Sequence, residues 1–425
     1  MSQHIMTKST TLYIILSLTM SFQLSFNANS SSVSMKKAGM FSSAHAMPPH
    51  NFTGSAIAEV TVQAQFTNGS AAEYSLNTLH QVNQVYKMTY KTKIIHVRID
   101  VGSHVYFKLD LRLNSQLIAK SFVQKSFSSK GEAIMVQAKS NYWNKTRLFT
   151  GHVIDNTNSL VSLRFQRGFT GVIEISEHQF LLEPFISGTT IWHTLTKHTS
   201  KNWKEPARCG TDLHIKGGVK PNHVGSVNRT KRQSVRPSGH TSSTTFLELY
   251  LVIDNQLFRR NNSMTATVQR AIDIVNYASV RFCQLNIYLA LVGVEVWNDD
   301  NKIPFKQTGT IRNGETIYDA FAISDEFKNY RLYTINKETR NDCSQLLSGA
   351  EFQDGIGGLA VVSSICSEAQ SAALVRDYPG SYVKTANSMV HEIGHNLGFE
   401  HISDPDCHCH NGKISSCIMA PYTSE

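Results

Sequence analysis

The chain has 425 residues, too many for one comfortable core, so two or three folded parts are expected. Its composition, 41% hydrophobic and 17% charged, is that of globular protein and excludes a low-complexity chain. Residues 1–232 hold 26 Lys and Arg against 11 Asp and Glu, whereas residues 233–425 hold 15 against 21. No nucleic-acid motif accompanies the basic half, so we expect no nucleic-acid partner. The opposite charges either favour docking of the two segments or are drift in composition.

Residues 1–30 predict a cleaved signal peptide. Lys8 precedes an apolar run at 11–26, and small polar residues follow. An uncleaved membrane anchor is the alternative, but Ser and Thr interrupt the run and it is short for a membrane span. We therefore expect a protein that is secreted, or that reaches the extracellular face of the cell surface by the secretory pathway.

Two further features agree with secretion. Six of the seven cysteines lie after residue 280, which predicts disulfide bonds formed in an oxidising compartment. Five sequons after the predicted signal peptide predict a glycoprotein. They begin at Asn51, Asn68, Asn144, Asn228 and Asn261.

Residues 31–196 are predicted to form a β-rich domain. Apolar, β-branched and aromatic residues run or alternate in several short segments, and turn residues separate these segments. The clearest segments are 94–99, 105–109 and 161–165.

Residues 197–232 are predicted to be a linker, because the sequence there is polar, punctuated by Gly and Pro, and without apolar periodicity. It contains Arg229, Lys231 and Arg232 in an Arg-x-Lys-Arg cluster. Such a cluster is often only a solvated patch. In the exposed linker of a secreted protein it predicts cleavage after Arg232 by a proprotein convertase of the furin type.

Residues 233–425 are predicted to be an α/β domain. Strands and long helices alternate in the pattern of apolar residues. The strands are expected at 246–253, 287–296 and 357–362, and the helices at 265–282 and 385–397.

The decisive motif is His391-Glu392-x-x-His395-x-x-Gly398-x-x-His401. Residues four apart on a helix share a face, so His391 and His395 present two imidazoles to one point. Gly398 can end the helix in a left-handed turn, after which the chain reverses and brings in His401. Three nitrogen ligands with one open position make a catalytic zinc site, and Glu392 lies where a general base is needed.

A lone histidine is usually structural, and a bare His-Glu-x-x-His occurs by chance. The extended pattern is far more specific and resembles the metzincin motif, which also requires a methionine turn downstream. The segment 416–421 supplies that turn, with Met419 expected beneath the metal as an apolar floor. The predicted reaction is hydrolysis of internal peptide bonds, with Glu392 as the catalytic base.

The chain resembles the reprolysin or ADAM branch of the metzincins, which also contains snake-venom metalloproteases. The similarity covers nearly everything after the signal peptide. Matching segments are 246–255, 285–293 and 358–366 in the catalytic part, and 151–153, 158–159 and 168–173 in the propeptide part. The resemblance implies a β-rich pro-domain followed by an α/β metzincin catalytic domain with a mixed twisted sheet and a long zinc-binding helix. It also implies a zymogen that cleaves extracellular or membrane-tethered proteins once its propeptide is removed.

Cys209 is the only cysteine in the first 232 residues. A thiolate binds zinc strongly, so it can fill the open position, which resembles the family's cysteine switch and makes the pro-domain the enzyme's own inhibitor. The alternative is an unpaired thiol without function. The resemblance also implies that Glu248 and Asp342 bind a structural calcium, and that the strand 358–362 pairs with an extended substrate.

Some positions depart from the family pattern. Ile402 stands where most reprolysins have Asp, with Asp404 two residues on, which puts a hydrogen bond to the ligand set in doubt. The cysteine pair usual in the propeptide is absent, with Leu148 and Gln166 in its neighbourhood.

The cysteines of the catalytic part match the family only in part. Cys409 with Cys417 is the local disulfide that the resemblance favours, and Cys283 and Cys343 are candidates to pair with each other. Two more cysteines match family positions whose partners lie farther along, Cys366 and Cys407.

The chain stops six residues after Met419, where the family's catalytic domains continue, so we expect it to be C-terminally incomplete. Membrane attachment would then depend on a C-terminal segment, which leaves a soluble protease and a membrane sheddase as alternatives. A competing class is an adhesion protein with a silent protease domain. The intact ligand set and Glu392 argue against that class.

Overall fold

The computed structural model describes residues 54–65, 71–89, 92, 94–102, 104–137, 146–176, 178–198, 207–211, 244–312, 314–402 and 417–423. All of them belong to one compact unit, residues 47–425. Within these ranges no helix is both long and apolar enough to cross a membrane. Several predictions fall on residues outside this description: the signal peptide, the sequons at Asn51, Asn68, Asn144 and Asn228, the processing residues Arg229, Lys231 and Arg232, and Asp404, Cys407 and Cys409.

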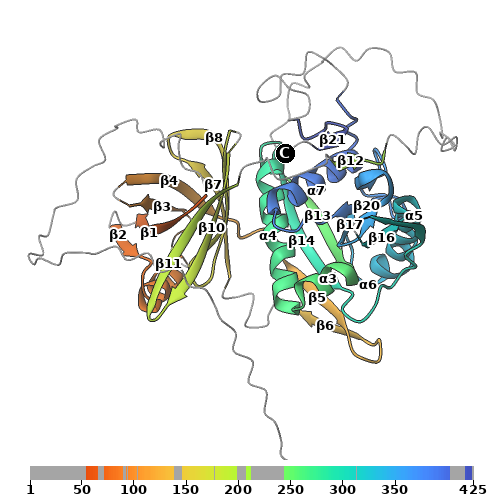
Figure 1. Ribbon diagram of the computed structural model, residues 1–425, viewed down its shortest axis with the longest axis horizontal. Coiled ribbons are helices and arrows are strands. Elements are labelled where there is room, and N and C mark those ends of the chain that lie inside the picture. The colour runs from red at the N-terminus through yellow and green to blue at the C-terminus, as the bar shows by residue number, and fades with distance from the viewer. Residues whose placement is uncertain are drawn as a thin grey trace, which may run out of the picture. The chain divides into compact units, whose positions relative to one another are not determined.

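An antiparallel sheet of nine strands forms most of the first part of the chain (Figure 1). Its order is β11-β10-β9-β8-β7-β4-β3-β1-β2, and β11 also pairs with β1, so the sheet closes on itself. Its strands are β1 (Ser55–Gln65), β2 (Ala71–Ser75), β3 (Ile94–Val101), β4 (His104–Leu113), β7 (Arg147–Val153), β8 (Asn156–Phe165), β9 (Phe169–Ile175), β10 (His178–Ser187) and β11 (Thr190–His198). A helix, α1 (Leu79–Met88), accompanies them.

The core of this sheet follows from its alternating sequence. In β3, Ile95, Val97 and Ile99 are at most 1% exposed, while the residues between them are partly exposed. Successive side chains of a strand point to opposite faces, so one face fills with apolar groups. The strands predicted at 94–99, 105–109 and 161–165 are all present.

The second sheet is mixed and has the order β21-β12-β19-β20-β17-β13-β14-β5-β6. Neighbours from β20 to β5 are parallel, and β19 is antiparallel to β20. Its strands are β5 (Ile118–Phe127), β6 (Ala133–Gln137), β12 (Ala207–Cys209), β13 (Thr245–Ile253), β14 (Ile287–Val296), β17 (Cys343–Ser348), β19 (Ile356–Ala360), β20 (Ala372–Arg376) and β21 (Tyr422–Thr423). A mixed sheet was expected for the second part of the chain.

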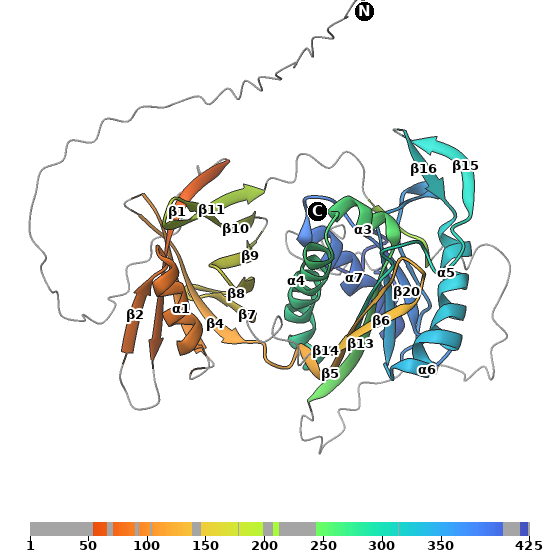
Figure 2. The same ribbon diagram turned by 90° about the horizontal axis from the view of Figure 1, so that it is seen from below.

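Helices cover both faces of this sheet (Figure 2). Leu249 and Leu251 of β13 pack in one core with α4 (Met264–Cys283) and α7 (Tyr382–Leu397). Tyr250 and Val252 of the same strand pack in another core with α5 (Ala320–Tyr330). Smaller elements complete this part: α3 (Asn255–Asn261), a π-helix (Arg331–Ile335), α6 (Asn336–Glu338), a 3-10 turn (Gln353–Gly355) and a sheet of β15 (Gln307–Arg312), β16 (Glu315–Tyr318) and β18 (Glu351–Phe352). The α/β character and both long helices were predicted.

Three strands of the second sheet come from the first part of the chain, which the sequence did not predict. The β5–β6 hairpin extends the sheet beyond β14 (Figure 2). Strand β12 lies between β19 and β21. Leu117 and Phe122, beside and within β5, are at most 1% exposed in the core that contains α4. The first part of the chain thus supplies part of the second sheet and part of its core.

The first part of the chain also contacts α4 through polar groups. Arg164 pairs with Asp273 at 2.9 Å, which agrees with docking of a basic segment on an acidic one. Glu174 pairs with Arg281 at 2.7 Å, and here the acidic residue belongs to the first part of the chain and the basic residue to α4. Net charge therefore accounts for only part of this contact.

Cys283 and Cys343, which the sequence named as candidates to pair with each other, do not form a disulfide. Both are free thiols: Cys283 is exposed at the end of α4, and Cys343 is buried at the start of β17. Cys366 is also free. Cys417 is disulfide-bonded, and Cys409, the partner expected for it, lies outside the described residues.

Candidate metal centre

Helix α7 presents the motif residues, and both of its ends are specified by local sequence. The Ser381 hydroxyl accepts a hydrogen bond from Lys384 N–H at 3.1 Å and caps the first turn. Gly398 ends the helix in the left-handed region at φ +99°, a conformation that residues with a Cβ disfavour. The chain reverses there, as expected, and brings back His401.

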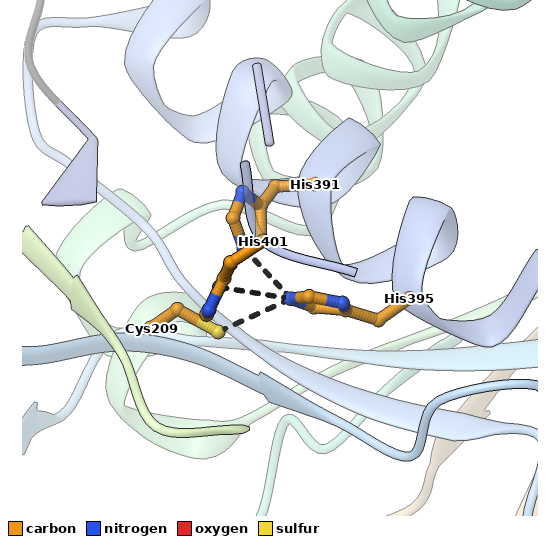
Figure 3. Close-up of side chains that lie close together, drawn as sticks. All are labelled: Cys209, His391, His395 and His401. Carbon is orange, nitrogen blue, oxygen red and sulfur yellow. Dashed lines mark hydrogen bonds between the residues drawn. The ribbon is translucent and has the colours of Figure 1, made fainter. Parts of the chain in front are cut away.

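Four side chains meet at one point (Figure 3). The ligand atoms of Cys209, His391, His395 and His401 all lie within 4.8 Å of one another. The Nε2 atom of His395 is 2.9 Å from that of His391, 3.1 Å from that of His401, and 3.5 Å from Cys209 Sγ. The structure thus brings together the four residues that the sequence proposed as metal ligands.

The ring orientations of two histidines are set by backbone carbonyls. His391 Nδ1 lies 2.6 Å from Ile418 O, and His395 Nδ1 lies 2.7 Å from Phe399 O. A carbonyl only accepts, so each Nδ1 carries the proton and each Nε2 turns a lone pair toward the cluster. Metal-ligating histidines are fixed in this way.

The cluster fits a tetrahedral zinc ion. Lone pairs of neighbouring nitrogens that face each other at 2.9–3.1 Å repel unless a cation lies between them. Zinc takes nitrogen at about 2.0–2.1 Å and sulfur at about 2.3 Å, so tetrahedral ligands stand roughly 3.3–3.6 Å apart. The observed spacings are close to these values, and the donor set of three imidazoles and one thiolate is one that zinc prefers.

Cys209 reaches the cluster because its strand is paired on both sides. Strand β12 runs parallel to β19, with Cys209 in register with Gly358, and Cys209 N–H donates to Pro421 O at 3.1 Å. The Thr211 hydroxyl donates to Ala360 O at 3.3 Å, and Thr211 N–H lies 3.5 Å from Sγ. The edge of β19 that was expected to bind substrate is therefore covered by the segment that carries the thiol.

Glu392 lies beside the cluster without being one of its four members. It is 2% exposed, and its Oε2 has no hydrogen-bond partner among the residues that the structure describes. Burial raises the pKa of the Glu392 carboxyl well above its usual range, and a hydrogen bond with Cys209 opposes this rise. An unpartnered oxygen next to a metal cluster is where a general base belongs.

Two glycines make this packing possible, and the sequence analysis missed both. A Cβ on Gly358 would lie 2.1 Å from Glu392 Oε1, and a Cβ on Gly394 would lie 2.7 Å from Met419 Sδ. Met419 therefore packs directly against α7, as expected for the floor of the site. The sequence did carry one sign of this packing, which is the glycine at position 394 inside a helix. Glycine lowers the stability of a helix interior, so its presence suggests that a neighbouring side chain occupies the place of a Cβ.

The two residues expected to bind calcium are adjacent. Glu248 N–H donates to Asp342 Oδ2 at 2.9 Å, and Asp342 N–H donates to Glu248 O at 2.9 Å. Among the described residues, the cysteine–histidine cluster is the only group of three or more ligands suited to a metal. Calcium binding at Glu248 and Asp342 stays a prediction.

Residues 245–425 match the model of the Reprolysin (M12B) family zinc metalloproteases. This part of the chain is a reprolysin domain. Reprolysins are zinc-dependent metalloendopeptidases, and the matched residues include all three histidines and Glu392. Cys209 lies before the matched residues.

A curated relative extends the similarity beyond the reprolysin domain. Disintegrin and metalloproteinase domain-containing protein 12 of Mus musculus is 30% identical over 318 residues, which cover 74% of this chain and 33% of the relative. The aligned stretch is longer than residues 245–425, so it includes part of the first half of the chain. The chain spans about a third of the length of this relative.

Proposed function

We propose that this chain is the zymogen of a zinc metalloendopeptidase whose zinc is held by His391, His395 and His401. The observation that carries the proposal is the convergence of three Nε2 atoms at 2.9–3.1 Å, two of them oriented by carbonyls on Nδ1. Membership of residues 245–425 in a zinc-dependent family supports it. The zinc would supply a Lewis acid and lower the pKa of a bound water.

The proton chemistry belongs to Glu392. Its Oε2 takes the proton of the attacking water, and the carboxyl returns that proton to the nitrogen that leaves when the peptide bond breaks. Met419 and Gly394 hold the floor of the site, and Gly398 ends the helix so that His401 can reach the metal. The substrates are proteins or peptides in an extended conformation, laid along the edge of β19.

Latency arises from the segment that now occupies this edge. Cys209 would supply the fourth ligand, and β12 pairs with the edge of β19 along which a substrate would lie. We propose that a proprotein convertase cuts after Arg232 and that the pro-domain, residues 31–196, then leaves with its linker, residues 197–232. A signal peptide at residues 1–30 would direct the chain to the secretory pathway, so the targets are extracellular or membrane-tethered proteins.

Metal analysis and one substitution test the proposal. We expect about one zinc per chain, and Glu392→Gln should keep that zinc while lowering kcat/KM by about a thousandfold. Glu400→Gln is the matched control, because Glu400 is exposed near the same helix end. A wild-type rate in the Glu392→Gln enzyme, or a mature protein that hydrolyses peptides without zinc, would exclude this mechanism.

A further inference from the structure

Lys125 of strand β5 is a buried lysine that the zinc chemistry does not use. It is 2% exposed, and its Nζ lies 2.7 Å from Glu338 Oε2 and 3.5 Å from Glu295 Oε2. Both acidic residues lie in the reprolysin domain, whereas Lys125 lies in the pro-segment. Buried lysines require such partners, because an unpaired ammonium is costly away from water.

Glu295 is the centre of a buried cluster of polar side chains from several elements of the reprolysin domain, called the Glu295 cluster below. It is 0% exposed, and it accepts hydrogen bonds from Tyr250 OH at 3.1 Å, Trp297 Nε1 at 2.8 Å and Tyr330 OH at 2.5 Å. Burial, and next the charge of Glu295, raise the pKa of both tyrosines, so they stay neutral donors. Because its three donors are neutral, the Glu295 cluster keeps the negative charge of the carboxylate, and Glu338 adds to it.

Strand pairing places Lys125 beside the Glu295 cluster. Strand β5 runs parallel to β14, and Lys125 is the register partner of Glu295, so both side chains stand on the same face of the sheet. Beyond the pair, Phe127 N–H donates to Asn298 Oδ1 at 2.7 Å, and Asn298 Nδ2 donates to Phe127 O at 2.8 Å. The backbone is therefore held on both sides of the lysine.

We propose that the edge of β14 and the Glu295 cluster form a second binding site, which takes a lysine on an extended strand and holds the pro-segment (the pro-domain with its linker) independently of zinc. The ligand in this chain is Lys125 within Ile118–Phe127. This inference rests on the proposed function in one respect: it takes Ile118–Phe127 to be part of the segment that is removed when the zymogen is activated. If only the contact between Cys209 and the metal were lost, the pro-segment would then stay bound.

The test uses the full chain, nicked in its linker. Residues 229–232 are replaced by the recognition sequence of a restriction protease, and Glu392→Gln prevents self-digestion. After nicking, release of the pro-segment is followed by size-exclusion chromatography in a strong zinc chelator, so that Cys209 holds no metal. The nicked parent chain should stay associated, and Lys125→Met should release the pro-segment about ten- to a hundredfold faster, because a buried carboxylate loses its cation.

The matched control is Lys120→Met, which alters an exposed lysine of the same strand and should release like the parent. Glu338→Gln supplies the partner variant, because Glu338 is 35% exposed and its change leaves Glu295 and the core in place. Lys125→Met combined with Glu338→Gln should release no faster than Lys125→Met alone, since the same pair is lost only once. Thermal unfolding of each nicked chain confirms that it is folded.

Equal release rates for Lys125→Met and Lys120→Met would overturn the proposal, and so would additive effects of Lys125→Met and Glu338→Gln. Because every measurement is made in chelator on an inactive chain, none depends on zinc or on peptide hydrolysis. The release rates would therefore still test the second binding site if the zinc or Glu392 tests failed. Slow release in the parent together with fast release in Lys125→Met would support the site whatever those tests show.

Discussion

Gly358 faces the carboxylate of Glu392 so closely that a Cβ at position 358 would lie 2.1 Å from Oε1. No real side chain tolerates such a contact, and Glu392 is a buried residue of α7. The missing side chain on β19 is what lets the carboxylate lie between the strand edge and the metal cluster.

Gly358→Ala should therefore displace Glu392 and lower kcat/KM of the mature enzyme. We expect a loss of about ten- to a hundredfold, because a small misplacement of a catalytic group is costly. The zinc content should stay at its wild-type value, since no ligand is touched. A Gly358→Ala enzyme with the same kcat/KM as the parent would show that the glycine does not set the position of Glu392.

Cys209→Ala should weaken latency in the uncut chain. With the thiol gone, the fourth ligand position opens to water, so peptide hydrolysis should rise at least about tenfold above that of the uncut parent. Activity should stay below that of the mature enzyme, because β12 still covers β19. Cys283→Ala is the control, because Cys283 is a free, exposed cysteine far along the chain. Equal latency in the two variants would remove the thiol from the mechanism.

Removal of zinc should lower the thermal stability of the uncut chain. The metal binds the folded cluster and not the unfolded chain, so chelation removes binding energy from the folded state. We expect the unfolding temperature to fall by roughly 2–4 °C for each kcal/mol lost. His395→Ala should unfold at a lower temperature and respond little to the chelator. An identical chelator shift in both proteins would mean that the cluster does not hold the metal.

Acid should weaken the first sheet through His193. Burial lowers the pKa of this side chain from 6.5 to about 4, and its Nε2 accepts a hydrogen bond from Phe169 N–H. The unfolded chain binds the proton first, so this stability is present above pH 6.5 and is lost as the pH falls toward 4. The loss should reach about 3 kcal/mol, visible as a lower urea midpoint at about pH 5 than at about pH 7.

His193→Gln keeps an acceptor for Phe169 N–H and should flatten this pH dependence. His178→Gln, at an exposed position of β10, should leave it unchanged. A His193→Gln chain with the parent's pH dependence would assign the effect to other groups.

The three histidines of the metal cluster were predictable because the information for them is local. The four-residue spacing of His391 and His395 and the left-handed turn at Gly398 follow from helix geometry alone. The pairing of β5 with β14 was not predictable, because the apolar pattern of a strand does not indicate which other strand it pairs with. The role of Gly358 likewise depends on Glu392 lying opposite it. Whether Cys283 pairs with Cys343 could not be decided from the sequence, because nothing in it says which distant segments lie close together.

Ile118 pairs with Leu291, although the linker and helix α4 lie between these two residues in the sequence. During synthesis the ribosome delivers β5 long before its neighbour exists, and the parallel ladder closes only after a large loop has been ordered. Such distant pairing slows folding, and an unpaired edge at β14 can meanwhile recruit strands from other chains. A reprolysin domain made without residues 118–137 would have this edge bare from the start, which predicts low yields of soluble protein.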